Sequence, residues 1–159
     1  MPATMPKWSI FCTLMSSTEF VILQKYTSST LEPAEYGLSG VFDRFPDLQV
    51  IIGHWGEVVL FYLERIEHLV AAAKLERPLS EYVRSNVFVT PSGMLSPRYL
   101  RWAIEILGAE RILFSTDYPF EPASQGGARR FLEAADLSDA DREKIASANW
   151  ERLCAGIRR

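Results

Sequence analysis

Short apolar runs and longer stretches of helical spacing alternate along most of this sequence. Three apolar runs have the composition of strands that are buried on both faces of a parallel sheet: Leu48–Gly53, Asn86–Thr90 and Arg111–Thr116. Elsewhere, apolar residues recur every three or four positions, which predicts helices. The predicted helices cover residues 31–45, 57–75, 78–84, 97–107, 125–135 and 138–157.

Residues at the ends of the predicted helices support these bounds. Ser96 and Pro97 are typical of an N-cap and a first helical turn, and Gly108 is typical of the position after a helix. Pro46 ends the first helix just before the first strand. Ser138 precedes acidic residues that stabilise the positive end of the last helix dipole. Local signals and periodicity therefore agree from residue 31 onward.

The order of these elements, strand then helix three times over, predicts a parallel sheet with right-handed crossovers. The strand centres near residues 52, 88 and 114 are 36 and 26 residues apart, close to the average of about 31 per unit in a (β/α)8 barrel. The sequence therefore predicts an α/β fold of the TIM-barrel type, with three βα units visible. Residues 1–30 lack this pattern and are treated as an unassigned leader. Val21–Leu23 has the composition of a short strand, but nothing around it supports the assignment.

The composition is that of an ordinary globular domain. The chain has 159 residues with 17 Lys+Arg and 20 Asp+Glu, which gives a formal net charge of −3. This near balance argues against nucleic acid or an anionic membrane surface as a partner, and no apolar stretch reaches the length of about 20 residues that spans a bilayer. Cys12 and Cys154 make no disulfide framework, which favours a reducing compartment. We therefore expect a cytoplasmic protein without nucleic-acid or membrane partners, and homo-oligomerisation remains open.

Ionisable and hydroxyl side chains follow each predicted strand. His54 stands between glycines after the first strand, Ser92 follows the second, and Asp117 follows the third. In parallel α/β folds, function gathers at these carboxyl ends of the strands. His54 could bind a metal, transfer a proton or be a buried histidine, and Asp117 could bind a metal, orient water or cap a helix. Ser92 could donate to an anionic substrate or only form a turn.

Other polar residues have simpler interpretations. Glu57 suits the N-terminus of the following helix, where a carboxylate satisfies the dipole. His68 lies within a helix as a solvated or partly packed residue, and Glu121 suits a surface cap or ion pair. The sequence has no phosphate-binding loop, dinucleotide fingerprint, CxxC pair, HExxH motif or nucleophile-elbow serine.

Several motifs resemble the C-terminal half of the amidohydrolase-related family: Gly40–Pro46, Val50–Glu57, Phe88–Gly93 and Arg111–Phe120. The paired Gly-His-x-Gly-Glu and Ser-Thr-Asp-Tyr-Pro-Phe signatures are similar to those of its metal-dependent decarboxylase branch, which includes the aminocarboxymuconate-semialdehyde and γ-resorcylate decarboxylases. The resemblance covers about residues 38–157. It implies a partial (β/α)8 barrel made of the last three βα units plus C-terminal helices, with 31–159 as the C-terminal part of the barrel domain.

The resemblance also implies a divalent metal, zinc or manganese, with Asp117 as a ligand and His54 in proton transfer beside it. The implied reaction is non-oxidative decarboxylation of a small aromatic or muconate-type carboxylate substrate, and hydrolysis by metal-activated water is an alternative within the family. The family's other metal-binding histidines have no counterpart, because the chain contains only His54 and His68. We therefore expect an incomplete metal site, and a truncated, non-catalytic barrel fragment is a further alternative.

Overall fold

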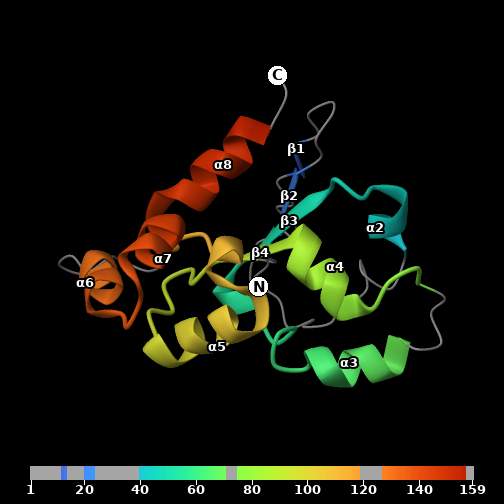
Figure 1. Ribbon diagram of the computed structural model, residues 1–159, viewed down its shortest axis with the longest axis horizontal. Helices are drawn as coiled ribbons and strands as arrows, with labels where there is room; N and C mark the ends of the chain where they lie inside the picture. Colours follow the sequence, from blue (N-terminus) through green and yellow to red (C-terminus); the bar gives the residue numbers. More distant parts are fainter. Residues whose placement is uncertain (1–11, 14–19, 24–39, 71–74, 119–126, 157–159) are drawn as a thin grey trace, which may run out of the picture.

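A computed structural model of the chain describes residues 12–13, 20–23, 40–70, 75–118 and 127–156 (Figure 1). Its sheet has the strand order β1-β2-β3-β4, where the strands are β1 Cys12–Thr13, β2 Phe20–Leu23, β3 Gln49–Ile52 and β4 Val87–Val89. β1 and β2 are antiparallel, whereas β2, β3 and β4 are parallel. The parallel pairing predicted for the first two strands is therefore confirmed, and the fold is mixed α/β.

β1 and β2 lie within the region that the sequence left unassigned. Phe20 pairs with Gln49 and Leu23 pairs with Ile52, so β2 forms a parallel ladder along the whole of β3. The candidate strand Val21–Leu23 is thus part of the sheet. So short a run carries little local signal, and its assignment depends on pairing with residues far along the chain.

The third predicted strand, Arg111–Thr116, does not form a ladder, and that prediction is wrong. Among the described residues, a single parallel bridge between Val89 and Ile112 joins it to the sheet, with the Leu113 amide donating to the Val89 carbonyl at 2.9 Å. The next pairing position on β4 is Pro91, which has no amide hydrogen to donate. The Pro91 carbonyl accepts the Met94 amide at 2.9 Å instead. Pairing therefore stops after Ile112.

The helices of the described residues mostly follow the predicted bounds. They are α2 Val41–Arg44, α3 Leu63–Val70, α4 Leu79–Asn86, α5 Pro97–Leu107, α6 Gly127–Ala134, α7 Asp139–Glu143 and α8 Asn149–Gly156, with the short 3-10 helices η1 His54–Gly56 and η2 Ala109–Arg111 and the π-helix η4 Lys144–Ala148. α5 has the predicted bounds, and Gly108 follows it with φ of 83°. None of these helices is both long and apolar enough to cross a membrane.

Two helix predictions need correction, and a third lies partly outside the described residues. The helix predicted over 57–75 begins only at Leu63, because Glu57 has a left-handed φ of 54° that no α-helix contains. The helix predicted over 138–157 is interrupted by the π-helical turn of η4. The helix predicted over 31–45 is described only from Val41 onward, and the remainder lies outside the described residues.

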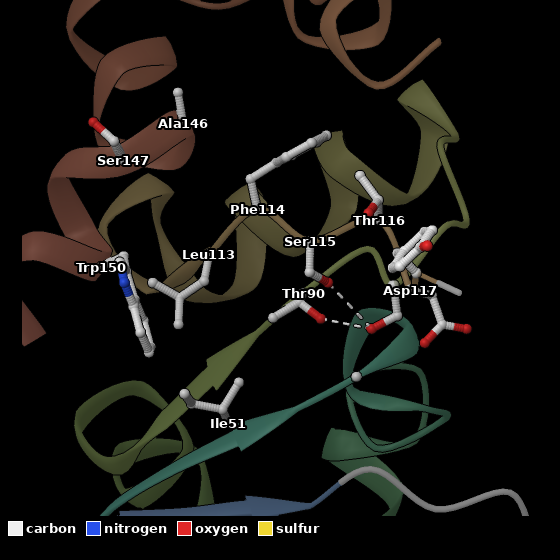
Figure 2. A pocket seen from close by; sticks show the side chains of 13 residues that line it. Ile51, Thr90, Leu113, Phe114, Ser115, Thr116, Asp117, Ala146, Ser147 and Trp150 are labelled. Carbon is white, nitrogen blue, oxygen red and sulfur yellow. Dashed lines mark hydrogen bonds between the residues drawn. The ribbon is translucent and has the colours of Figure 1, made fainter. Parts of the chain in front are cut away.

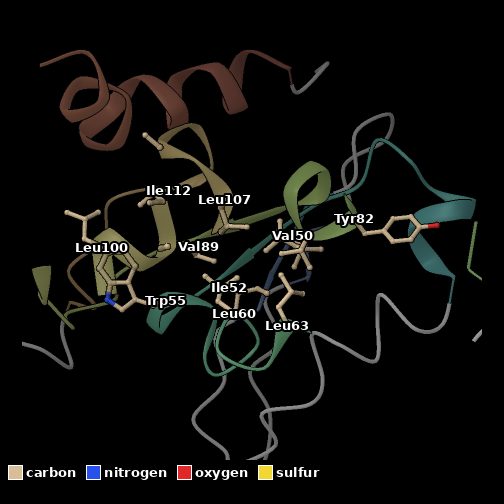
Figure 3. Close-up of a cluster of buried hydrophobic side chains, with 14 of the residues drawn as sticks. Val50, Ile52, Trp55, Leu60, Leu63, Tyr82, Val89, Leu100, Leu107 and Ile112 are labelled. Carbon is tan, nitrogen blue, oxygen red and sulfur yellow. The ribbon is translucent and has the colours of Figure 1, made fainter. Parts of the chain in front are cut away.

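The sheet is packed on both faces, as its continuous apolar runs predict. Alternate residues Val50, Ile52, Val87 and Val89 belong to the main core with side chains of α3, α4 and α5 (Figure 3). The intervening residues form a second cluster with Leu153 of α8: Ile51, Phe88 and Leu113. Each fully buried aliphatic side chain of this kind contributes about 1.5–3 kcal/mol. α8 therefore closes the face of the sheet that α3–α5 leave open.

Two fully buried asparagines fix the amino-terminal ends of the strands. The Asn86 amide donates to the carbonyls of Pro46 and Leu48 at 2.9 and 2.7 Å. The Asn149 amide donates to the carbonyls of Ala109 and Ile112 at 2.8 and 2.9 Å. Each side chain donates to two backbone carbonyls at the end of an element, and such buried acceptors need a partner. These contacts set where β3 and the segment after η2 begin, and hence where their carboxyl ends lie.

Candidate active site

His54 and Asp117 meet at the carboxyl edge of the sheet. His54 opens η1 directly after β3, and Asp117 ends the extended segment that follows the Val89–Ile112 bridge. The His54 Nε2 and Asp117 Oδ2 atoms are 3.8 Å apart, and the two side chains are 22% and 4% exposed. This separation is longer than a hydrogen bond and suits an ion pair when the imidazole is protonated. Sequence reasoning predicted that these two residues share one edge.

Glu57 holds the other nitrogen of the same ring. Its Oε1 lies 3.1 Å from His54 Nδ1. The sequence interpretation of Glu57 as a helix N-terminal carboxylate is therefore wrong, because α3 begins six residues later, at Leu63. With a carboxylate near each nitrogen, the imidazole is held in one orientation.

The loops of this site hold strained backbone. Among the described residues, the non-glycine residues with positive φ are His54, Trp55, Glu57, Ser92 and Asp117, at 47°, 59°, 54°, 42° and 59°. All five lie at the carboxyl edge of the sheet. Such conformations cost about 1–3 kcal/mol each and cluster where a site needs side chains in fixed positions.

Trp55 anchors the loop after β3. Its indole nitrogen donates to the Met94 carbonyl at 2.7 Å, and its amide donates to the Thr90 carbonyl at 2.8 Å. The side chain is 5% exposed and belongs to the main core. The strained loop is thus fixed both to the loop after β4 and to the hydrophobic interior.

Three hydroxyl groups, called here the hydroxyl cluster, lie beside Asp117. Ser92 Oγ is 2.7 Å from Thr90 Oγ1 and 3.4 Å from Ser115 Oγ (Figure 2). Ser92 is 5% exposed, and a Cβ at Gly53 would lie 3.0 Å from its oxygen. Glycine at position 53 leaves room for this close approach, whereas a side chain there would crowd the Ser92 oxygen. Ser92, which the sequence singled out, therefore sits in a tightly packed polar corner.

A cavity of about 530 Å³ opens between this corner and α8. Asp117 and the hydroxyl cluster line one end, and Ile51, Leu113 and Trp150 line the other (Figure 2). Its volume falls within the range of small-molecule sites, about 300–1,000 Å³. His54 is not part of the lining, but its ring lies beside Asp117, which is. The cavity suits a small molecule with one polar and one apolar end.

Sequence reasoning missed part of this lining. Ser115 lies two residues before Asp117 in the segment 113–118, all of which lines the cavity, so its place beside Asp117 could have revealed it. Trp150 comes from a helix distant in sequence and carried no such signal. Of the remaining polar candidates, His68 is exposed on α3, and Glu121 lies outside the described residues.

The donors at this edge do not complete a metal site. Zinc sites use three or more protein ligands, and no group of three His, Cys, Asp or Glu side chains that could hold a metal occurs among the described residues. His54 and Asp117 offer one nitrogen and one carboxylate ligand. The described part of the chain therefore supplies at most a portion of a donor set.

Comparison with known proteins gives consistent matches. A sequence model described as amidohydrolase matches residues 32–153. The γ-resorcylate decarboxylase of Polaromonas sp. is 39% identical over 121 residues, which are 72% of this chain and 36% of that protein. The chain therefore spans little more than a third of the length of this curated relative.

Solved structures agree in fold. The 5-carboxyvanillate decarboxylase of Sphingomonas paucimobilis superposes with a TM-score of 0.71 at 35% identity over 76% of this chain and 38% of that one. A dihydroxybenzoic acid decarboxylase from Polaromonas sp., solved with manganese and the inhibitor 2-nitroresorcinol, gives a TM-score of 0.69 at 36% identity over 82% and 42%.

Proposed function

This chain belongs to the amidohydrolase family, and on that basis we propose that it forms part of a carboxy-lyase that removes CO2 from a small aromatic carboxylic acid. The family resemblance predicted from its motifs is confirmed. The relatives described above decarboxylate dihydroxybenzoate and carboxyvanillate, as their names state. The observation that carries the proposal is the His54–Asp117 contact beside a cavity with one polar and one apolar end.

We further propose that residues 31–159 are the C-terminal part of a (β/α)8 barrel domain. In this proposal, β3, β4 and the segment after η2 correspond to the last three barrel strands. β2 pairs in parallel with the edge of β3 where a barrel places its preceding strand, which supports the assignment. We also propose a cytoplasmic location, which the unpaired thiol of Cys154 supports.

The cavity residues suit the binding of an aromatic acid. Ser92, Ser115 and Thr90 can donate hydrogen bonds to a carboxylate or phenolic oxygen at one end. Ile51, Leu113 and Trp150 can contact the ring at the other. Net decarboxylation adds a proton to the ring carbon as its bond to CO2 breaks. His54, held by Glu57 and facing Asp117, is the proposed source of that proton.

A divalent metal, zinc or manganese, would supply Lewis-acid stabilisation of the substrate oxygens when bound. Asp117 is the proposed ligand from this chain, because its carboxylate lines the cavity and oxygen and imidazole donors suit either ion. The remaining ligands would come from outside the described residues. A non-catalytic fragment is the second candidate, and the shortage of metal donors among the described residues favours it.

A decarboxylation assay with matched histidine variants tests the proposal. Purified chain is supplied with manganese or zinc and 2,6-dihydroxybenzoate, and the product resorcinol is followed by chromatography. We expect turnover that falls at least about 100-fold in His54→Gln, the usual loss for a missing acid–base group, and persists in His68→Gln. No turnover with either metal would favour the fragment, and equal turnover in both variants would exclude His54 as the proton source.

A further inference from the structure

A second cavity, of about 400 Å³, opens at the amino-terminal ends of the strands. Gln49 from the start of β3, Arg111 from the end of η2 and Arg152 from α8 line it, and we call it the arginine cavity. His54 and Asp117 lie at the opposite, carboxyl ends of the same parallel segments. The proposed reaction therefore leaves this cavity and its two arginines without a role.

The guanidinium group of Arg111 is held in a fixed position. Its Nη1 donates to Gln49 Oε1 at 2.9 Å, and its Nη2 donates to the Ser85 carbonyl at 2.6 Å. Its Cζ atom lies 4.8 Å from the centre of the Phe88 ring, so the ring supports one face of the cation. A cation that is already oriented in this way loses little freedom when it binds a ligand.

Arg152 is fixed by one nitrogen of its guanidinium group. Its Nη2 donates to the Glu110 carbonyl at 3.0 Å and to Asn149 Oδ1 at 3.2 Å. A guanidinium carries five N–H donors, and among the described residues these two bonds are the ones that Arg152 forms. Its Nε and Nη1 groups are therefore available to a ligand in the cavity that Arg152 lines.

No carboxylate of the described residues forms an ion pair with either arginine. The carboxylate of Glu110 folds over Gly108 instead, because its oxygens would lie 2.6 and 2.9 Å from a Cβ added there. Burial lowers the pKa of Arg111, and the positive charge of Arg152 lowers it further, whereas Glu110 raises it. Two cations that repel each other across one cavity favour the binding of an anion between them.

We propose that Arg111 and Arg152 bind the phosphate group of a small molecule in the arginine cavity. A phosphate group carries a charge of about −1.5 to −2 at pH 7, which matches two guanidinium groups, whereas a carboxylate carries a single charge. The planar fork of arginine also donates two parallel hydrogen bonds to phosphate oxygens. Phe88 and Leu153 line the same cavity and can contact an organic group that carries the phosphate. The proposal does not depend on the proposed decarboxylation, because the two cavities share no lining residue.

Calorimetric titration of the full chain with inorganic phosphate, at constant ionic strength, tests the proposal. Arg152→Gln should raise the dissociation constant at least about 10-fold, because it removes charge-assisted hydrogen bonds. Arg98→Gln is the matched control: it removes the same charge from an exposed position on α5 outside the cavity and should bind as the parent does. Circular dichroism confirms that both variants fold. A parent chain that does not bind phosphate, or equal dissociation constants in the two variants, would overturn the proposal.

Two further titrations test the charge argument and identify the source of the phosphate group. Glu110→Gln removes the negative charge that acts on Arg111 and should lower the dissociation constant about 2–5-fold. Weaker or unchanged binding in that variant would contradict the charge argument on which the proposal rests. Phenyl phosphate that binds more tightly than inorganic phosphate would identify a phosphate monoester as the ligand. Equal affinities would identify free phosphate, and both results support the proposed site.

Discussion

Replacing Gly53 with alanine probes how tightly the hydroxyl cluster is built. The added Cβ would lie 3.0 Å from Ser92 Oγ and 3.7 Å from Ser92 Cβ. The Gly53 backbone, at φ −68° and ψ 178°, accepts alanine without strain, so any cost comes from the clash. Ser92 cannot easily turn away, because its oxygen lies 2.7 Å from Thr90 Oγ1 and its φ is 42°.

The expected cost follows from these contacts. Crowding in a packed site costs about 1–3 kcal/mol, and losing the Ser92–Thr90 hydrogen bond costs about 0.5–1.5 kcal/mol. The lower entropy of the unfolded alanine chain offsets about 0.4–1 kcal/mol. Gly53→Ala should therefore lower the free energy of unfolding by about 2 kcal/mol, as measured by urea denaturation.

Making the same substitution in a Ser92→Ala variant separates this clash from other effects. Ser92→Ala removes the crowded oxygen and leaves the nearest atom at 3.7 Å, so Gly53→Ala should become neutral or slightly stabilising there. Gly127→Ala is the control, because its Cβ would meet no atom within 4 Å. An equal cost of Gly53→Ala in both backgrounds would refute the reasoning.

Three further predictions concern other parts of the molecule. Asn149→Ala should lower the free energy of unfolding by about 2–4 kcal/mol in urea denaturation, because the carbonyls of Ala109 and Ile112 each lose a buried donor; a loss below about 1 kcal/mol would contradict this. Burial raises the pKa of Tyr82 above 10.0, and the hydrogen bond it donates to Asp43 adds to the shift. The free energy of unfolding should therefore fall as the pH rises above about 10, because tyrosine in the unfolded chain ionises first. The fall should be less steep in Tyr82→Phe. Equal slopes of unfolding free energy against pH in the two proteins would contradict this prediction. If the cavity binds aromatic acids, Trp150→Ala should raise the dissociation constant for 2-nitroresorcinol about 2–12-fold in calorimetry, the range for one aromatic pair, with Trp150→Phe restoring most of it.

Local signals predicted α5 correctly, whereas strand pairing depended on distant residues. Ser96, Pro97 and Gly108 mark the ends of α5 within the sequence itself. The failed ladder at 111–116 follows from Pro91, which lies in another segment and ends the pairing edge of β4. β2 likewise becomes a strand through its ladder with β3. The sequence pattern within one segment therefore cannot show whether that segment finds a pairing partner elsewhere in the chain.

The candidate site was predictable to the extent that strand ends define it. His54 and Asp117 follow parallel segments that lie on either side of β4, so topology places both at one edge of the sheet, where they meet at 3.8 Å. Glu57 was misassigned because nothing local indicates the left-handed turn that takes it out of a helix and onto the His54 ring. Trp150 was missed because the packing of α8 across the sheet is set by Leu153 and its distant partners.

Metal stoichiometry is the most direct measure of whether this edge of the sheet is a metal-dependent site. The chain is incubated with manganese or zinc, dialysed and analysed by elemental mass spectrometry beside Asp117→Asn and Asp47→Asn. Asp47 is exposed just before β3, at the opposite end of that strand from His54, and serves as the matched control. We predict one bound ion per chain in the parent and in Asp47→Asn, and its loss in Asp117→Asn. Metal that is absent from all three proteins, or retained in Asp117→Asn, would contradict the assignment.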